Sequence, residues 1–446
     1  MCKTSRLPWW QFDPKQAFKA CISAAIIATV VMVGGGTPAA YAQGQGLAAV
    51  APVDPANGFP QLYQDRTGQK LGPCLNTSAA NPCGLAGTIP NPALPISFPN
   101  NFPSEFFYWN AVAVIKSGNF RATLTMALEG TFGNATGAVV DGQQIVFARF
   151  RFRTTGGKLT PGATYTLTHP FGVKTFVAAA DATINFTDDQ GCTIAPPACN
   201  FGTVLTSTNV GPFLKWDATA PAPPAGFIGD GVTPHKITGS PFGTNFARLD
   251  GPNVGGNNKD TIQIDLFTVM GQISTASSPT PLTVDRTSFS RTVAGGSEID
   301  LLAHTVGNGT LIATGTGIPN TTLTTDPATG RAGARIVLAP GAALPTTISY
   351  TASSPGSTAT VSNNPLIDEV TVATATYSQA SGSLTVNATS SDQVGTPTLS
   401  AAGNPSEPLG TLTAGTLTTP LVAPPFQVNV TSSEGGTDKL LVDLTQ

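Results

Sequence analysis

The chain of 446 residues carries a formal net charge of −3, and only 11% of its residues are charged. Proteins that bind nucleic acids normally have a basic excess, because neutralised phosphates supply most of their affinity, so this charge argues against that class for the chain as a whole. The low charge and the many glycines and prolines, 48 and 38 respectively, favour a turn-rich all-β protein over a helical enzyme.

The first 42 residues have the pattern of a secretory signal peptide. Basic residues precede a short apolar run over residues 21–33, and a segment of small residues follows it. We expect cleavage before Gln43, and the apolar run is too short to span a membrane comfortably. Removing four of the 22 basic and one of the 25 acidic residues leaves 18 and 24, a net charge of −6. The prediction is a secreted protein, at the cell surface, in the periplasm or outside the cell, with no membrane span after cleavage.

Composition divides the remaining chain near residue 277. Residues 43–276 contain both remaining tryptophans, all four remaining cysteines and two of the three histidines, whereas the later residues contain no tryptophan or cysteine. The segment "STASSPTPLTVD" between the two parts has the composition of a linker. We therefore predict a β-rich domain over residues 43–276 and, after the linker, two further domains over residues 281–366 and 367–446.

The four remaining cysteines form two local couples, "CLNTSAANPC" and "CTIAPPAC". Four cysteines allow three pairings, but short loops that contain proline or asparagine favour the neighbour pairs, Cys74–Cys83 and Cys192–Cys199. The spacing lacks the CxxC of a zinc site, and an exported chain meets an oxidising compartment. Each disulfide is expected to close and hold a short loop.

Aromatic residues are concentrated in "FPNNFPSEFFYWN" and "GPFLKWD", which contain Trp109 and Trp216. Tyrosine and tryptophan combine an apolar face with a polar group, so an exposed platform of such rings on a β-sandwich can hold sugars. The same residues can instead form the core of a domain that is otherwise short of leucine and isoleucine. We favour the core interpretation and keep a sugar-binding platform as the alternative.

An arginine row follows in "QQIVFARFRFRTT". The two-residue period of a strand places Arg149, Arg151 and Arg153 on one face and the neighbouring phenylalanines on the other. Three guanidiniums on one face can bind a carboxylated or sulfated polymer, because each offers a planar fork to such groups.

The alternative for the arginine row is a solvated surface. The arginines would then pair across strands with acidic residues such as Glu129 or Asp141, at about 0.2–1 kcal/mol for each pair. We expect this second outcome. The segment after the row, L-x-P-G-x-x-Y from Leu159 to Tyr165, resembles the corner of fibronectin-type sandwiches, in which a tyrosine hydroxyl bonds to upstream backbone. That resemblance places the arginines on the strand just before the corner.

His169 and His235 each lie near a Pro-Phe-Gly element, in "HPFG" and "HKITGSPFG". This internal similarity predicts that two alike loops meet at one end of the domain. Together with a nearby aspartate, the histidines could ligate a metal or serve as acid and base. Histidines flanked by proline in loops are more often turn residues, and no HExxH, GxSxG or complete SxxK pattern is present. We assign no catalytic residue and expect no cofactor.

The segment "DGPNVGGNNKD" offers Asp250, Asn253 and Asp260 as oxygen ligands for calcium. It does not follow the D-x-[DN]-x-[DN]-G pattern of an EF-hand loop, and clusters of asparagine and glycine usually form loops without a metal. A loop without calcium is the preferred interpretation.

The second half repeats itself, because "PLTVDRTSFSRTVAGGSEIDLLAHT" parallels "DEVTVATATYSQASGSLTVNATSSD". These units of short strands and frequent turns resemble the immunoglobulin-like modules of bacterial surface proteins, which implies antiparallel sandwiches. Segments of residues 57–273, such as "FPNNFPSEFFYW" and "GSPFGTNFARLDGP", resemble a group of secreted bacterial proteins of unassigned activity. That resemblance implies a shared fold and export route and lends no catalytic residue.

The predicted fold is therefore all-β, with a disulfide-stapled N-terminal β-sandwich-like domain followed by two immunoglobulin-like β-sandwiches. The expected function is that of a secreted or cell-surface, non-enzymatic binding or structural protein with spacer repeats. The alternative is an extracellular polysaccharide-binding module or polysaccharide-directed enzyme with its site in the N-terminal domain, near His169 and His235. An extracellular glycan or anionic polymer is the expected partner.

Overall fold

The computed structural model describes residues 45–446 except for 77–82, 135, 157–158, 194–198 and 404–406. The predicted signal peptide lies outside these residues. Within them the chain is almost entirely β, and the single helical element recorded is the short 3₁₀ turn η1 (Phe201–Thr206). No helix in this part of the chain is long and apolar enough to cross a membrane. The all-β fold class predicted from the sequence is confirmed.

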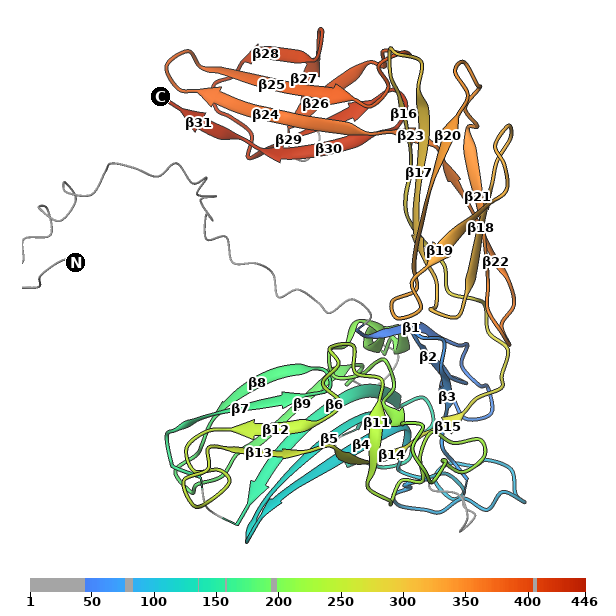
Figure 1. Cartoon of the computed structure of the whole chain (residues 1–446), viewed down its shortest axis with the longest axis vertical. Helices are drawn as coiled ribbons and strands as arrows, with labels where there is room; N and C mark the ends of the chain where they lie inside the picture. The colour runs from blue at the N-terminus through green and yellow to red at the C-terminus, as the bar shows by residue number, and fades with distance from the viewer. Residues whose placement is uncertain (1–44, 77–82, 135, 157–158, 194–198, 404–406) are drawn as a thin grey trace, which may run out of the picture. The chain divides into compact units, whose positions relative to one another are not determined.

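The N-terminal region contains three sheets (Figure 1). The largest has seven strands in the order β10 (Lys215–Trp216), β11 (His235–Thr238), β14 (Leu266–Met270), β4 (Glu105–Ser117), β5 (Phe120–Phe132), β6 (Gln144–Thr155) and β9 (Asn185–Gly191). A four-stranded sheet has the order β13 (Thr261–Ile264), β12 (Ala247–Asp250), β7 (Thr164–His169) and β8 (Gly172–Val177). A smaller sheet has the order β1 (Leu47–Val50), β2 (Tyr63–Asp65), β3 (Lys70–Gly72) and β15 (Gln272–Ile273).

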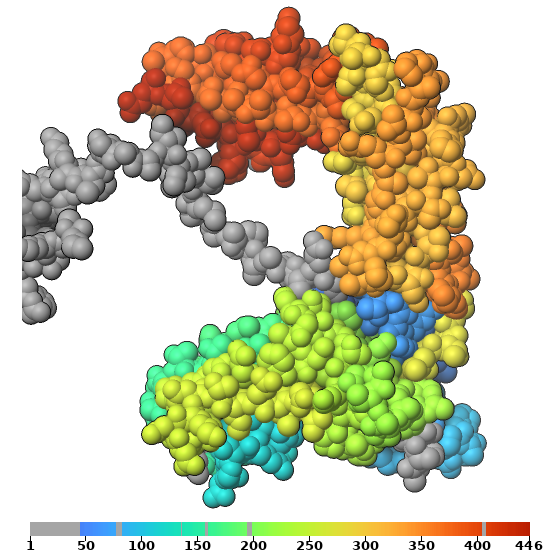
Figure 2. Space-filling view, viewed as in Figure 1, coloured from blue at the N-terminus to red at the C-terminus, as the bar shows by residue number. Residues whose placement is uncertain are grey.

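The hydrophobic core of the N-terminal region lies between the seven-stranded sheet and the four-stranded sheet formed by β13, β12, β7 and β8. Apolar residues of both sheets belong to one buried cluster, and the Phe152 ring of β6 stacks on the Phe176 ring of β8 with centroids 5.3 Å apart. Figure 2 shows that side chains fill the space between the ribbons. Because successive side chains of a strand point to opposite faces, the even-numbered residues of β6 from Val146 to Phe152 enter this core, as the two-residue period predicts.

The corner predicted between β6 and β7 forms the expected contact. The Tyr165 hydroxyl accepts a hydrogen bond from the upstream backbone N–H of Thr160 at 2.8 Å and donates to the carbonyl of Pro252 at 3.0 Å. Tyr165 is fully buried, so both contacts anchor the corner to the core. The arginine row on β6 therefore precedes the corner, as the motif predicts.

The first part of the second half is a continuous eight-stranded sheet. Its order is β22 (Thr360–Pro365), β21 (Thr347–Ser353), β18 (Thr310–Thr314), β19 (Thr321–Thr325), β20 (Arg331–Leu338), β17 (Ser297–His304), β16 (Thr283–Arg291) and β23 (Ile367–Asp368). Strand β19 pairs with β18 on one side and β20 on the other, so it joins two halves that share one core.

The last part of the chain has two separate four-stranded sheets around its own core. Their orders are β28 (Thr416–Pro420), β25 (Ser383–Ser390), β24 (Val370–Ser378), β31 (Asp443–Thr445), and β27 (Glu407–Thr411), β26 (Leu399–Gly403), β29 (Gln427–Ser432), β30 (Thr437–Leu441). Both parts of the second half begin with a bulged hairpin whose first strand carries a buried aromatic, Phe289 or Tyr377, and pairs in parallel with the last strand. The domain boundaries and the immunoglobulin-like relationship stay predictions.

Candidate functional site

The strongest charge feature of the N-terminal region lies on the outer face of the seven-stranded sheet, opposite the core. Arg149, Arg151 and Arg153 of β6 point to this face, because their neighbours Phe150 and Phe152 enter the core. The register between strands adds two cations, since Arg121 of β5 lies opposite Thr155 of β6 and Lys116 of β4 lies opposite Arg121. We call these five side chains the cation face: Lys116, Arg121, Arg149, Arg151 and Arg153.

Arg149 is the member of the cation face with acidic partners. Its Nε and Nη2 donate to the two carboxylate oxygens of Asp189 on β9, each at 2.8 Å. Its Nη1 lies 2.8 Å from Oε2 of Glu129, in an ion pair rather than a well-oriented hydrogen bond. The predicted pairing with Glu129 is therefore present. Asp141 does not take part, because its Oδ1 accepts from Gly142 N–H and Gln144 Nε2 in the β5–β6 loop.

The other arginines of the cation face have no acidic partner among the described residues. Arg153 Nε donates to the neutral amide oxygen of Asn185 at 3.0 Å, and Arg121 Nε donates to Thr123 Oγ1 at 3.3 Å. The buried Nε of Arg151 has no acceptor in the part of the chain that the structure describes. Partial burial and the flanking guanidiniums, Arg149 first, lower the pKa of Arg151. The prediction that these arginines are neutralised by acidic neighbours thus holds for Arg149 and is wrong for Arg151 and Arg153.

Lys116 and Arg121 were not singled out from the sequence. Both are exposed, and no ion pair involves either of them among the described residues. The alternation in "FRATLTMALEGTF" does put Arg121 on the polar side of its strand. Only the pairing of β4, β5 and β6 shows that this side continues the arginine row.

Both predicted disulfides are present, with Cα–Cα distances of 5.3 Å for Cys74–Cys83 and 5.5 Å for Cys192–Cys199. Each covers part of the same outer face. Cys192 and Cys199 pack on Ile145 and Phe147 of β6. Cys74 and Cys83 pack in a second cluster with Phe107 of β4, Phe227 and Met270. The disulfides therefore cover one end of the face and leave the cation face beside it.

Glu129 occupies the covered end, in register with Phe107 on one side and Phe147 on the other. Its side chain is only 2% exposed. Burial raises the pKa of Glu129 to about 8, and the nearby Arg149 guanidinium opposes that shift only in part. A carboxyl group that titrates near neutral pH therefore contacts the cation face.

The two tryptophans do not form a sugar-binding platform. Trp109 is fully buried and its Nε1 donates to the Leu214 carbonyl at 3.0 Å. Trp216 is 6% exposed and stacks on His235, with centroids 4.4 Å apart and an interplanar angle of 13°. Neither offers a free ring face to a sugar, because both pack in the core as the preferred interpretation predicts.

The two histidines are buried in different sheets. His169 at the end of β7 is 2% exposed and lies 4.8 Å from the Phe150 ring, and its Nδ1 accepts from Phe171 N–H at 3.3 Å. Burial, with a smaller effect from Lys174, lowers the pKa of His169 to about 3, so this imidazole is neutral at physiological pH. His235 begins β11 and its Nδ1 lies 2.8 Å from the Lys236 carbonyl. Their burial leaves the hypothesis of a solvent-open acid–base pair without a site.

The two Pro-Phe-Gly loops do meet, as their similarity predicts. Ser240 Oγ donates to the Pro170 carbonyl at 2.7 Å, and Thr244 Oγ1 donates to the His169 carbonyl at 3.0 Å. Both contacts join a side-chain hydroxyl to a backbone carbonyl. They hold the end of the core and bring no ionisable side chains together.

In the proposed calcium loop, the carboxylates accept hydrogen bonds from the chain itself. Asp260 Oδ1 accepts from Asn253 N–H at 2.7 Å, and Asp250 accepts from Thr261 Oγ1 at 2.7 Å and from Arg248 Nε at 2.9 Å. Among the described residues there is no group of three or more His, Cys, Asp or Glu side chains placed to hold a metal. These oxygens close the loop between β12 and β13.

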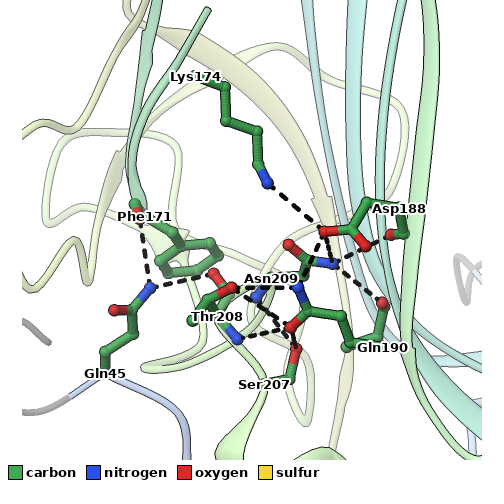
Figure 3. A network of polar contacts seen from close by, with 9 residues as sticks. Gln45, Phe171, Lys174, Asp188, Gln190, Ser207, Thr208 and Asn209 are labelled. Atoms are coloured by element: carbon green, nitrogen blue, oxygen red, sulfur yellow. Dashed lines mark hydrogen bonds and ion pairs between the residues drawn. The ribbon is translucent and has the colours of Figure 1, made fainter. Parts of the chain in front are cut away.

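A polar network that the sequence did not reveal lies at the open edge between β8 and β9 (Figure 3). Asn209, which is 1% exposed, donates from Nδ2 to the backbone and side chain of Asp188 and to the Ala148 carbonyl. Lys174 Nζ reaches Asp188 Oδ2 at 3.5 Å from the opposite sheet and lies 4.8 Å from the centroid of the Phe150 ring. This network holds β9, the strand that presents Asp189 to the cation face.

Comparisons with known proteins identify no family. No protein-family description and no curated protein matches the chain. Among solved structures, the chain is similar to a Ca²⁺-stabilised adhesin that helps an Antarctic bacterium bind ice, with 12% identity over 73% of this chain and 82% of that chain and a TM-score of 0.15.

The chain is also similar to solved structures of a 1.5-MDa bacterial ice-binding adhesin and of the BSP domain of a biofilm-associated protein. The former shows 11% identity over 67% of this chain and 91% of that chain, with a TM-score of 0.16. The latter shows 9% identity over 74% and 77%, with a TM-score of 0.18. Such low TM-scores support no conclusion about fold or function.

Proposed function

We propose that this chain is an exported, non-enzymatic binding protein whose N-terminal region contacts an anionic extracellular polymer, a carboxylated or sulfated glycan, through the cation face. One observation carries the proposal. Lys116, Arg121, Arg151 and Arg153 have no acidic partner among the described residues, and they lie on one face of one sheet. Only 11% of the residues in the chain are charged, so these unpaired cations on one sheet face are a high local concentration of positive charge.

The chemistry of the face fits oxyanions. A guanidinium presents parallel N–H donors that match the two oxygens of a carboxylate or sulfate, and charge-assisted hydrogen bonds are about twice as strong as neutral ones. Residues two apart on a strand lie roughly 7 Å apart, and directly opposite residues about 5 Å. A chain with repeated anionic groups can therefore contact several cations of the face at once.

The rest of the molecule supports a binding role more than a catalytic one. His169 and His235 are buried against aromatic rings and do not face solvent, although His235 Nδ1 lies 3.7 Å from Asp217 Oδ1. Two disulfides suit an oxidising extracellular compartment. In this proposal the two repeated parts of the second half act as spacers that hold the N-terminal region away from the cell envelope or from a partner.

The proposal is tested by binding of the mature chain, residues 43–446, to immobilised dextran sulfate and polyuronate, with uncharged dextran as a blank. We expect Arg151→Ala/Arg153→Ala to weaken binding at least about tenfold, because two charge-assisted contacts are lost. We also expect affinity to fall as salt is added, since exposed charges are screened.

A matched control is Arg331→Ala/Lys439→Ala, which removes two exposed cations from the second half and changes the net charge equally. This control should bind like the parent. Equal binding by the Arg151/Arg153 double variant and the parent would show that the face is only a solvated sheet surface.

A further inference from the structure

Glu129, Arg149 and Asp189 form a connected row of charge across three strands at the border of the cation face. Arg149 on β6 contacts Glu129 on β5 at 2.8 Å and both oxygens of Asp189 on β9 at 2.8 Å. Asp189 is 26% exposed, whereas Glu129 is 2% exposed. Arg149 therefore bridges one solvated carboxylate and one buried carboxyl group.

The charged groups that face Glu129 come from each strand packed around it. Arg149 and Arg151 approach from β6, Glu105 from β4 and Asp189 from β9. The residues directly in register with Glu129 are the phenylalanines 107 and 147, which give it no polar contact. Burial among apolar groups favours the neutral form, and the two carboxylates add to this effect, so the pKa of Glu129 is raised to about 8.

We infer that Glu129 is the proton-sensing residue of the cation face, and that its deprotonation weakens the binding of anionic polymers. This inference rests on the function proposed above. When Glu129 is protonated, Arg149 and Asp189 balance each other and the unpaired cations dominate the face. When Glu129 is ionised, the row carries a net negative charge beside Arg151 and repels the polymer.

Thermodynamic linkage requires that polymer binding in turn affects the protonation of Glu129. Because the protonated form binds the polymer better, polymer binding favours protonation of Glu129. Binding near the pH at which Glu129 titrates must therefore be accompanied by proton uptake. This quantity can be measured in the parent protein, without a substitution.

The test uses the mature chain and dextran sulfate, whose sulfate groups stay ionised, so that any pH dependence comes from the protein. Dissociation constants are compared at about pH 7 and about pH 9.5, at equal ionic strength. We expect binding by the parent to weaken by about threefold or more at the higher pH, the effect of one added charge roughly 7 Å from a bound anion in a water-like medium. Calorimetry in buffers of different ionisation enthalpy should show proton uptake near pH 8.

Two variants separate the possible causes. Glu129→Gln should bind equally at both pH values, because its amide does not titrate. Asp189→Asn removes one charge from the same row but keeps Glu129. It should bind more tightly than the parent and keep a pH dependence, with its midpoint at lower pH, because Asp189 no longer raises the pKa of Glu129.

The possible results distinguish failure of the proposed function from failure of this inference. If the parent does not bind dextran sulfate at either pH, the proposed function fails. If the parent binds equally at both pH values without proton uptake, or if Glu129→Gln keeps the full pH dependence, the inference fails and the proposed function stands.

Discussion

Glu129 shows how the burial of one residue changes the chemistry of its surroundings. The carboxyl group lies in register between Phe107 and Phe147, against which the disulfide cysteines pack, so ionisation costs more in the folded protein than in the unfolded chain. Its nearest cationic neighbour, Arg149, is shared with Asp189 and does not restore the ordinary pKa. The stability of the N-terminal region should therefore depend on pH through this residue.

We predict that the free energy of unfolding of the N-terminal region falls as pH rises from about 7 to about 9. Below this range the lowered pKa of His169 gives an opposite pH dependence. The pKa of Glu129 is raised from 4.5 to about 8 on folding. Its contribution is fully present below the unfolded pKa and is lost as pH rises through the folded value, with a slope of at most about 1.4 kcal/mol per pH unit. Urea unfolding at several pH values, followed by the fluorescence of Trp109 and Trp216, measures it.

In that experiment Glu129→Gln should flatten the pH dependence. A parent protein whose stability is constant or rises over this range would contradict the raised pKa.

The tight packing around Gly130 leads to a second prediction, about stability, at the residue scale. A Cβ at this position would lie 2.3 Å from Cζ of Phe106, inside the cluster of phenylalanine rings. We expect Gly130→Ala to destabilise the N-terminal region by about 1–3 kcal/mol, because a close-packed core cannot move the ring away freely. Gly84→Ala is the matched control, since its Cβ would meet neighbours only at 3.5 Å or more. Equal denaturation midpoints for the two variants would count against a rigid core at this point.

Strand β6 illustrates what an element contributes that single residues do not. Its alternation sends phenylalanines to the core and arginines to solvent, and its two neighbours, β5 and β9, decide the electrostatic environment of each arginine. Arg149 meets Asp189 directly in register, whereas Arg151 meets Thr187 and Arg153 meets Asn185. The cation face therefore depends on the register of β9, which the buried Asn209 helps to hold.

We expect Asn209→Ala to loosen β9 more than the rest of the sheet. The substitution leaves the Ala148 carbonyl without one donor and Asp188 without two contacts in a buried site, a loss of about 1–3 kcal/mol. Hydrogen exchange should become faster over residues 185–191. Asn185→Ala, at an exposed position of the same strand, is the control and should leave exchange within β9 nearly unchanged. Unaltered protection of β9 in Asn209→Ala would mean that the network does not hold the strand.

At the scale of the whole molecule, the core residues fall into clusters that do not cross residue 277. The large cluster uses residues from 47 to 269, and the two clusters of the second half use residues from 289 to 366 and from 370 to 430. All disulfides and tryptophans of the described residues belong to the first part. Reduction of the disulfides changes the first part alone, so it can test the predicted domain boundary.

Reduction of the disulfides should destabilise the N-terminal region and leave the second half unchanged. Closed loops with sequence separations of 9 and 7 each contribute roughly 2–3 kcal/mol in the chain-entropy model. Calorimetry of the oxidised and of the reduced, alkylated chain should show one transition that moves to lower temperature and another that stays in place. A joint shift of all transitions would mean that the parts unfold together.

Short-range features could be read from the sequence, because they depend on residues near one another along the chain. The two-residue period decides which side chains of β6 face the core, and seven- or nine-residue separations favour local cysteine pairs. The corner motif ending at Tyr165 places its hydroxyl near Thr160, five residues upstream. These predictions agree with the structure because sterics and short loops leave few alternatives.

The electrostatic character of each arginine was decided only by the tertiary structure. Asp189 is 40 residues from Arg149 in the chain, and nothing local indicates that β9 will pair with β6. The same holds for Lys116 and Arg121, which join the face through the pairing of β4, β5 and β6. The sequence by itself determined the all-β character and the direction of each side chain on its strand. Charge pairing depends on distances of a few ångströms between separate strands, so only the folded sheet decided which cations stay unpaired.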